Sequence, residues 1–402
     1  MINKAFYHRL LSRNSLVIVA LIALFCKPLM AANNVHVNGF ISQGIQQAQQ
    51  TNFVNQDGDV SFELTEIGIN GGWQFDEQFG VNGQVVYLNA GNRYPEGFRL
   101  DYLFLDWHAV SRPNLNVNIH IGRYKNYHWM YSATRDVPHT RPNNLLPQSI
   151  YFDSFRDIAL GSDGIAIRAN ASNDLGDWVM DWSYGSSPIN QQSTQQLLGP
   201  DADGKIEQEF THQASAYWHS QSSDWMLGLN LLDSDFRYLN TPNDSFVMGN
   251  ATVQRLSLVA QYQTQYWELA SEILRERSIY DGVLFDGFSN DSSAEGGYVQ
   301  FTWLPTARLD LMIRLDLYDL NRDDRNGQLL ALSSNGAIPN YFGFMDTGTL
   351  GLKFQLYDNL QLQAEVNRVR GAGRLTPLLV KDAQTANSEY WNMWSIQLMY
   401  WF

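Results

Sequence analysis

Apolar and polar residues alternate along most of the chain, from Val35 to Phe402. In the clearest stretch, every second position from 309 to 317 is Leu or Ile, and the positions between them include Asp310, Arg314 and Asp316. Because successive side chains of a β-strand point to opposite faces, this period of two predicts strands with one apolar and one polar face. No long segment shows the spacing of an amphipathic helix. The pattern therefore predicts an all-β protein.

Turn-forming residues divide this pattern into about sixteen strands, joined by connections that are alternately short and long. The short connections are polar, such as Asp76-Glu77 and Asp358-Asn359, and the long ones are rich in Gly, Asn and Asp. An even number of strands with this alternation is typical of a transmembrane antiparallel β-barrel of the outer membrane. The predicted strands are 35–48, 60–75, 78–90, 99–110, 115–125, 163–171, 176–186, 208–221, 223–236, 250–263, 266–278, 293–305, 308–321, 345–357, 360–371 and 389–402.

Large aromatic residues gather at the short turns, among them Trp73, Trp225 and Trp303. Amphipathic rings are favoured at the level of lipid headgroups, so this placement indicates a girdle at one membrane surface. A soluble β-sandwich is the alternative, but it gives no reason to place the largest aromatics at one set of turns only. The last strand alternates as far as Tyr400 and Phe402 and resembles the signal that the barrel assembly machinery recognises.

The first 31 residues are typical of a secretory signal peptide. A basic start without acids precedes the apolar run from Leu16 to Phe25, and the small residues Ala31 and Ala32 follow. We therefore expect residues 1–31 to be removed and residues 32–402 to form the barrel. A lipoprotein signal at Cys26 is the alternative, but Phe25 stands where such signals have a small residue.

Composition narrows the class of protein further. The formal net charge is −14, and removal of residues 1–31 takes away four basic residues and no acid, which argues against nucleic acid as a partner. Beyond residue 31 no apolar run approaches twenty residues, and the mean hydropathy is −0.30, which excludes membrane-spanning helices. The single cysteine, Cys26, lies in the expected signal peptide, so a mature disulfide or thiol nucleophile is excluded.

The longest connection, 126–162, is the third of the long ones. Prolines at positions 138, 142 and 147 prevent a continuous helix or strand, and ordered loops of this length are usually functional. Its arginines and aspartates balance in number. We expect them to line a pore constriction, with the candidate residues Arg135, Asp136, Arg141, Asp153, Arg156 and Asp157. The alternative is a solvated loop that lies over the mouth of the barrel.

The chain after residue 31 resembles the sixteen-stranded porins of Gram-negative outer membranes in strand count, length of the third outer loop and terminal Phe402. Within that loop, residues 134–138 (Thr-Arg-Asp-Val-Pro), 140–142 (Thr-Arg-Pro) and 146–151 (Leu-Pro-Gln-Ser-Ile-Tyr) are similar to a porin-like family of aquatic gammaproteobacteria. The resemblance implies that the loop folds into the barrel and narrows it, so that opposed Arg and Asp side chains sort solutes by charge. It also implies a homotrimer.

Charged side chains on the polar faces of the strands indicate a water-filled lumen, because on the lipid side each would cost a few kcal/mol. About half of these charges are expected to be structural pairs. Arg368 and Arg370, near an outer strand end, are candidates for contact with lipopolysaccharide phosphates. The residues expected on the lumen wall are Arg123, Arg168, Arg255, Arg314, Asp316, Lys353 and Asp106.

Enzymatic patterns are weak in this sequence. Asp106, His108 and His120 form the best acid–base cluster, but no HExxH or GxSxG motif accompanies them. Residues 201–204 resemble the start of a calcium loop, although Glu207 and Glu209 come too early to complete it. We therefore expect no enzyme, no cofactor and no metal.

The sequence predicts a porin-type channel for passive diffusion of small hydrophilic solutes or ions. The alternative is a barrel plugged by its own loops that acts as a receptor, an adhesin or an outer-membrane enzyme. The expected partners are outer-membrane lipid and lipopolysaccharide, the barrel assembly machinery and small solutes.

Overall fold

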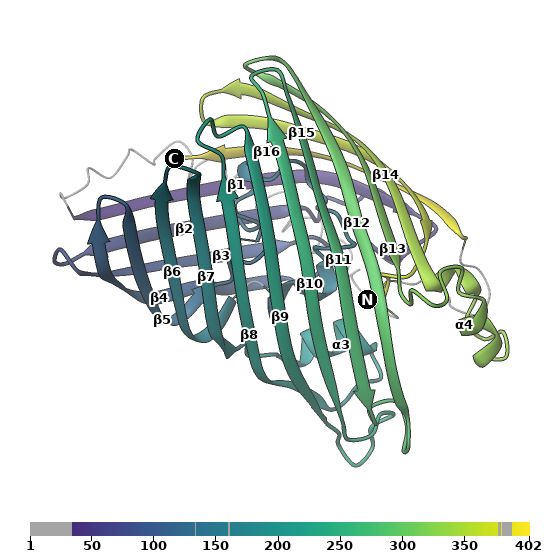
Figure 1. Ribbon diagram of the computed structural model, residues 1–402. Coiled ribbons are helices and arrows are strands. Elements are labelled where there is room, and N and C mark those ends of the chain that lie inside the picture. The colour runs from purple at the N-terminus through teal and green to yellow at the C-terminus, as the bar shows by residue number, and fades with distance from the viewer. Residues whose placement is uncertain (1–33, 133, 160, 377–378, 380–387) are drawn as a thin grey trace, which may run out of the picture.

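The computed structural model describes residues 34–132, 134–159, 161–376, 379 and 388–402, so the expected signal peptide, 1–31, lies outside the described residues. Within them, sixteen antiparallel strands form a closed barrel in which each strand pairs with its neighbours in the chain and β1 pairs with β16 (Figure 1). The strands are β1 (Val35–Gln49), β2 (Thr65–Gln74), β3 (Phe79–Asn89), β4 (Gly97–Arg112), β5 (Leu115–Lys125), β6 (Gly161–Asn173), β7 (Gly176–Ser186), β8 (Lys205–His219), β9 (Trp225–Leu239), β10 (Gly249–Gln263), β11 (Trp267–Asp281), β12 (Ser289–Thr306), β13 (Leu309–Asp319), β14 (Phe344–Tyr357), β15 (Leu360–Gly371) and β16 (Tyr390–Trp401).

The predicted fold is confirmed, because each predicted strand overlaps one observed strand. The larger differences lie at the long connections. β12 begins at Ser289 rather than at 293, because its first residues pair through their backbone with the end of β11. Those residues are all polar, so the alternation of side chains did not predict them.

The two faces of the barrel wall differ as the alternation predicts. On β13, Ile313 and Leu315 are exposed on the outer face, whereas Arg314 and Asp316 are buried on the inner face. The outer face is therefore apolar and the inner face polar, which is the reverse of a soluble globular protein and typical of a transmembrane barrel. This alternation fixes the register, because a slip of one residue would exchange the faces of a whole strand.

The barrel closes where the first strand meets the last. The backbone N–H of Gly39 donates to the carbonyl of Phe402 (3.1 Å), and the N–H of Phe402 donates to the carbonyl of Gly39 (3.0 Å). A Cβ atom added at Gly39 would lie only 2.5 Å from Cζ of the Phe402 ring. Glycine at this position therefore makes room for the terminal ring at the seam.

Aromatic rings line the end of the barrel that carries the short connections. Trp73, Phe75, Phe79 and Trp107 form a continuous series of ring contacts, with centroids 5.5 to 6.4 Å apart. Trp73 is 56% exposed on the outer face. The rings therefore lie at the end of the barrel where the sequence pattern predicts the aromatic girdle.

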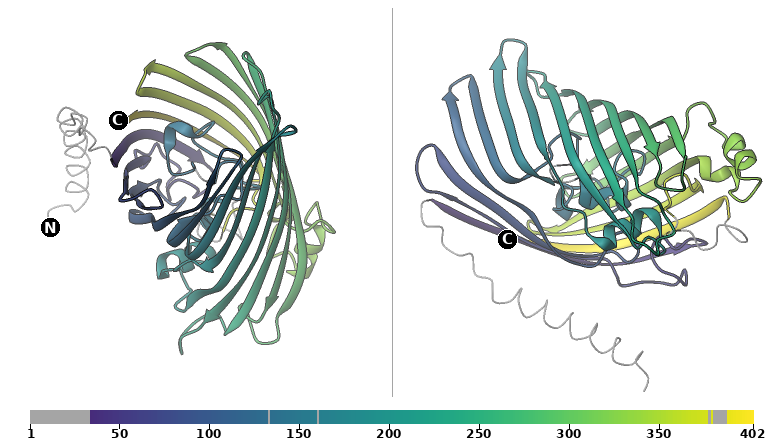
Figure 2. Two further views of the ribbon diagram at one scale, coloured as in Figure 1. Left: turned by 60° about the vertical axis from the view of Figure 1, so that its left-hand side comes forward. Right: turned by 90° about the horizontal axis from the view of Figure 1, so that it is seen from below.

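Helices occupy the long connections. Segment 126–159 contains η1 (Pro138–Thr140), η2 (Asp153–Phe155) and α2 (Arg156–Ala159), α3 (Gln191–Leu198) precedes β8, and α4 (Gln328–Ser333) and η3 (Asn340–Gly343) precede β14. The α4 helix projects beyond one rim of the barrel (Figures 1 and 2). Among the described residues, no helix combines the length and the apolar character needed to cross a bilayer.

Candidate functional site

Segment 126–159, which joins β5 to β6, contacts strands all round the barrel. Its partners lie on strands on opposite sides of the ring, so the segment extends across the space that the wall encloses (Figure 2). The contacts are Arg141 with Glu66 of β2 (2.8 Å), His128 with Tyr217 of β8 (3.4 Å), Tyr151 with Glu272 of β11 (2.6 Å), Leu145 with Arg314 of β13 (2.7 Å) and Glu365 of β15 (3.1 Å), and Asn144 with Ser395 of β16 (2.9 Å).

The Asp153 carboxylate is one centre of a buried charge network. It accepts hydrogen bonds from Nε of Arg93 (2.8 Å) and from Nη2 of Arg135 (2.7 Å). All three side chains are at most 4% exposed. Burial alone would raise the pKa of the Asp153 carboxyl, but the charges of Arg93 and Arg135 outweigh burial and hold this pKa below its usual value.

The Asp136 carboxylate is the second centre. It pairs with Arg156 and accepts a hydrogen bond from Nζ of Lys125 (3.2 Å), and Lys125 also donates to Asp101 of β4 (2.6 Å). Burial would raise the pKa of the Asp136 carboxyl, but Arg156 and Lys125 outweigh burial and hold this pKa well below its usual range. Each charge of the network therefore has a partner of opposite sign, as buried charges require.

The predicted constriction residues come together in this network. Arg135, Asp136, Arg141, Asp153 and Arg156 surround one cavity with a volume of only about 10 Å³. They are paired with one another or with the wall, and they do not face one another across a wide gap. The sixth candidate, Asp157, has a side chain that lies outside the described part of the chain.

Sequence reasoning missed two charged members of the network, Arg93 and Asp101. Arg93 lies in the connection between β3 and β4, and Asp101 lies near the start of β4. An arginine in a second long connection and an aspartate at an inward position were visible signals. Their pairing with a segment that begins at residue 126 depends on the path of that segment, which the sequence pattern did not give.

On the side of β11 and β12, tyrosine hydroxyl groups hold segment 126–159 to the barrel wall. The Tyr151 hydroxyl donates to Glu272 (2.6 Å) and accepts from the backbone N–H of Tyr131 (2.8 Å), and Tyr298 of β12 also donates to Glu272 (2.8 Å). Burial, followed by the charge of Glu272, raises the pKa of Tyr151 well above its usual value, so this phenol stays a donor. No local pattern in the sequence marks these tyrosines, so they were not predicted.

The predicted wall residues on the inner face have different neighbours. Arg314 donates to the Leu145 carbonyl and Asp316 accepts the Ser149 backbone N–H (3.4 Å), so both support the segment. The other contacts are Arg255 with Glu276 of β11, Arg168 with Asp181 of β7 (3.6 Å) and with the ring of Tyr127 (4.3 Å), and Lys353 with a 280 Å³ cavity that Glu268 and Asp310 also line.

Asp106, His108 and His120 also come together. Nε2 of His108 and of His120 lie 3.3 and 3.4 Å from the Asp106 carboxylate, which also accepts a hydrogen bond from Asn118 (2.9 Å). His120 is buried against the ring of Phe104, with centroids 4.3 Å apart. Among the described residues, no group of three or more His, Cys, Asp or Glu is arranged to hold a metal ion.

Arg123 is not on the lumen side, which corrects the prediction. It shares a strand face with the exposed Ile121 and forms two 2.7 Å hydrogen bonds to Asp163 of β6. Its cross-strand neighbours follow the same parity, since Ile121 pairs with Ile165 and Arg123 pairs with Asp163. The charge was assigned to the lumen by residue type, whereas its odd-numbered position beyond Ile119 and Ile121 already indicated the outer face.

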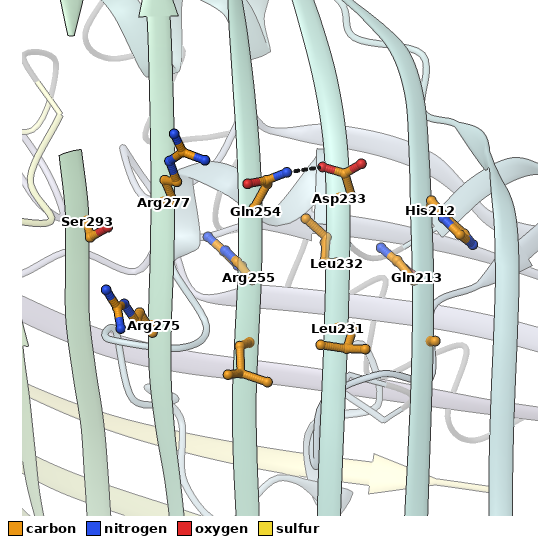
Figure 3. Close-up of a pocket in the computed structure, with 12 residues that line it drawn as sticks. His212, Gln213, Leu231, Leu232, Asp233, Gln254, Arg255, Arg275, Arg277 and Ser293 are labelled. Carbon is orange, nitrogen blue, oxygen red and sulfur yellow. Dashed lines mark hydrogen bonds between the residues drawn. The ribbon is translucent and has the colours of Figure 1, made fainter. Parts of the chain in front are cut away.

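A shallow hollow of about 590 Å³ lies on the outer face between β8 and β12 (Figure 3). Leu231 and Leu256 form its apolar part, and Gln254 donates to Asp233 (3.1 Å) beside them. Arg277 is held by Asp291 through two hydrogen bonds (2.9 and 2.6 Å). The hollow marks the level at which the apolar band of the outer wall gives way to charged side chains.

The same fold occurs in solved outer-membrane proteins. An anion-selective porin from Comamonas acidovorans matches 92% of this chain and 99% of its own, at 11% identity and a TM-score of 0.57. OmpT, an outer membrane protein of Vibrio cholerae that is also solved in a trimer form, matches 94% and 100%, at 10% identity and 0.57. The outer membrane channel DcaP of Acinetobacter baumannii matches 92% and 97%, at 10% identity and 0.56.

Neither a protein-family profile nor a curated protein matches the sequence. The likeness is therefore one of structure, and at these identities it shows the fold. The chain has the fold of the sixteen-stranded outer-membrane porins.

Proposed function

We propose that this protein is an outer-membrane channel for small hydrophilic solutes or ions, in which segment 126–159 sets the narrowest cross-section. The observation that carries the proposal is the set of hydrogen bonds and ion pairs that fastens the segment to strands on opposite sides of the barrel. A closed sixteen-stranded wall encloses a wide lumen, so matter inside it decides what can pass.

The pairing of the charges bears on selectivity. In the network, Asp153 pairs with Arg93 and Arg135, and Asp136 pairs with Arg156 and Lys125. Lys125 also pairs with Asp101, so that four basic side chains are matched by three acidic ones. Because opposite charges lie in direct contact, their fields largely cancel at a distance of several ångströms. We expect a low conductance and only weak charge selectivity at this level, in contrast to a pore with opposed charged rings.

A second candidate function is a barrel plugged by its own segment that acts as a receptor, an adhesin or an enzyme platform. The observation that favours it is the small free volume, about 10 Å³, at the centre of the charge network. That volume is about what one water molecule needs.

Partners follow from the same proposal. We propose a homotrimer, since OmpT of Vibrio cholerae, an outer membrane protein of this fold, has a trimer form. We also propose recognition of the strand ending in Tyr400 and Phe402 by the barrel assembly machinery. Lipopolysaccharide phosphates are proposed ligands of Arg368 and Arg370, which lie exposed on the outer face of β15.

Current through planar bilayers tests the proposal. The purified protein should give steady ohmic steps in KCl, and deletion of residues 138–147 should raise the step size severalfold, because it removes matter from the narrowest section. Deletion of residues 335–337, which are exposed in the connection between α4 and η3, is the control and should leave the step unchanged. Silence of the full chain together with current through the deletion variant would support the plugged barrel, and silence of both would refute a channel.

A further inference from the structure

A cavity with a mostly apolar lining lies inside the barrel against segment 126–159. It has a volume of about 870 Å³ and is bounded by the inner face of β8 to β13 and by the long connections at that end. Its apolar lining includes Phe155, Ile158, Phe236, Val253, Leu330 and Leu375. Pockets of this size hold organic ligands of moderate size.

The inner wall changes its character at this cavity. Below the cavity the inward residues of β9 are Asn230, Leu232 and Ser234, whereas the two that follow, Phe236 and Tyr238, line the cavity. On β10, Ala251 and Val253 line the cavity with Arg255 at its floor, and Ser257 and Val259 follow on the same face below it. Apolar side chains in a lumen that carries water are costly, so a run of them over several strands indicates a surface for an apolar solute.

The floor of the cavity carries two guanidinium groups for one carboxylate. Arg255 pairs with Glu276, and Nη1 of Arg374 lies 3.5 Å from the same carboxylate. All three side chains are more than nine-tenths buried. Asp316 also attracts Arg374, but it does not line the cavity and accepts the Ser149 backbone N–H.

Arg374 has a free donor. Its Nη2 donates to the Ser149 carbonyl (3.1 Å) and its guanidinium stands 3.9 Å from the centroid of the Tyr318 ring, whereas Nε has no hydrogen-bond partner among the described residues. The remaining charged lining residues are engaged elsewhere, since Arg237 pairs with Glu209 and Asp324 accepts the backbone N–H of Leu330 (2.9 Å). A cation that lines the cavity and shares its one neighbouring lining carboxylate with Arg255 favours an anionic group on the ligand.

We propose that this cavity binds an amphipathic organic monoanion, with a carboxylate or sulfonate at Arg374 and an aromatic or aliphatic body against Phe236 and Val253. The proposal rests on the proposed channel function, because it names a class of solute that the channel would take up. The ligand would displace no ion pair, since it adds the second anion to a floor with excess positive charge.

Calorimetry with the mature chain in lipid nanodiscs tests the site. The probes are 4-phenylbutyrate, the neutral 4-phenylbutanol and the cationic 4-phenylbutylamine, which share one apolar body. We expect phenylbutyrate to bind at least about tenfold more tightly than the alcohol, since a hydrogen bond to a charged group contributes roughly 1.5–3 kcal/mol. Arg374→Gln should reduce that ratio to about one, and Val253→Asn should weaken both probes alike.

Arg277→Gln, on the outer face, is the matched control and should change neither affinity. Equal affinity for acid and alcohol, tighter binding of the amine, or binding that survives both inner-wall substitutions would overturn the proposal. Heat modifiability on gels verifies that each variant is folded. Current in KCl without any probe tests the channel separately. Binding of phenylbutyrate by a protein that carries no current would refute the channel but not the site. Current through a protein that binds no probe would refute the site but not the channel.

Discussion

Asp153 shows how much one carboxylate can hold in place. Its replacement by Asn leaves Arg93 and Arg135 buried without their counter-charge, and breaking a buried pair in this way costs about 3–5 kcal/mol. We expect Asp153→Asn to loosen segment 126–159, to increase cleavage within it by added protease and to raise single-channel current. Asp323→Asn, at a side chain that is 84% exposed, is the control and should behave like the wild type. An unchanged segment in Asp153→Asn would show that this ion pair does not hold it.

Because of His128, we expect segment 126–159 to be held less firmly inside the barrel at acidic pH. Burial, with a smaller contribution from Arg255, lowers the pKa of His128 to about 3, whereas an exposed imidazole titrates near 6.5. At a pH between about 3 and 6.5, His128 binds more protons when the segment is loosened than when it is packed inside the barrel. The stabilisation is therefore complete above about pH 6.5 and is lost as the pH falls toward 3.

Current measured at pH 7 and pH 4.5 tests this prediction. The wild type should show larger or noisier steps at pH 4.5, and His128→Gln should flatten the difference. His139→Gln should flatten it less, because burial lowers the pKa of His139 to about 4 and the group is only partly buried. His36→Gln, at an exposed position, serves as the control. A pH response that is equal in all four proteins would exclude these histidines as its source.

Residue type alone predicted charges in the segment but not their partners. Arg135, Asp136, Arg141, Asp153 and Arg156 were predicted because an ordered loop of this length is usually functional, whereas Arg93 and Asp101 belong to other parts of the chain. Arg123 was misplaced because its charge was given more weight than its parity. Distances between residues far apart in sequence are set by the path of the backbone, which no local pattern contains.

At the level of single elements, the strands follow from the period of two, and the path of segment 126–159 does not. The sequence of a strand alone shows which residues share a face. On β13, Ile313 and Leu315 lie on the outer face, and Arg314 and Asp316 lie on the inner face. The prolines of the segment only exclude regular structure. Its course depends on partners on many strands, so the sequence left it open between a solvated loop and an inward one.

Single cysteines on β13 test the placement of the segment. Arg314 and Asp316 face inward but are only 1% and 3% exposed, because Leu145 and Ser149 of the segment lie against them. Cysteines at 314 and 316 should therefore resist a membrane-impermeant maleimide in the full chain. The cysteine at 314 should react in the variant that lacks residues 138–147, because that deletion removes Leu145. A cysteine at 313, on the outer face, should stay protected by lipid in both. Labelling at 316 in the full chain would place the segment away from β13.

The integrity of the whole barrel depends on the seam between β1 and β16. At Gly39 a larger side chain would collide with the Phe402 ring, so Gly39→Val should lower the yield of assembled, heat-modifiable barrel severalfold, as removal of Phe402 should. Gly348→Val is a matched control, since a Cβ added there meets nothing within 4 Å and the glycine also lies in a strand. Equal yields for the two valine variants would contradict a role of the seam in assembly.

The tethers of segment 126–159 also impose an order on folding. Asn144 and Ser395 are 251 residues apart in the chain, and Arg141 and Gln363 are 222 apart. Closing so long a loop costs entropy that is recovered only after the intervening strands are fixed. We therefore expect the tethers to β15 and β16 to form only after the wall is complete, so that the segment is held less tightly in a newly made barrel than in the finished protein.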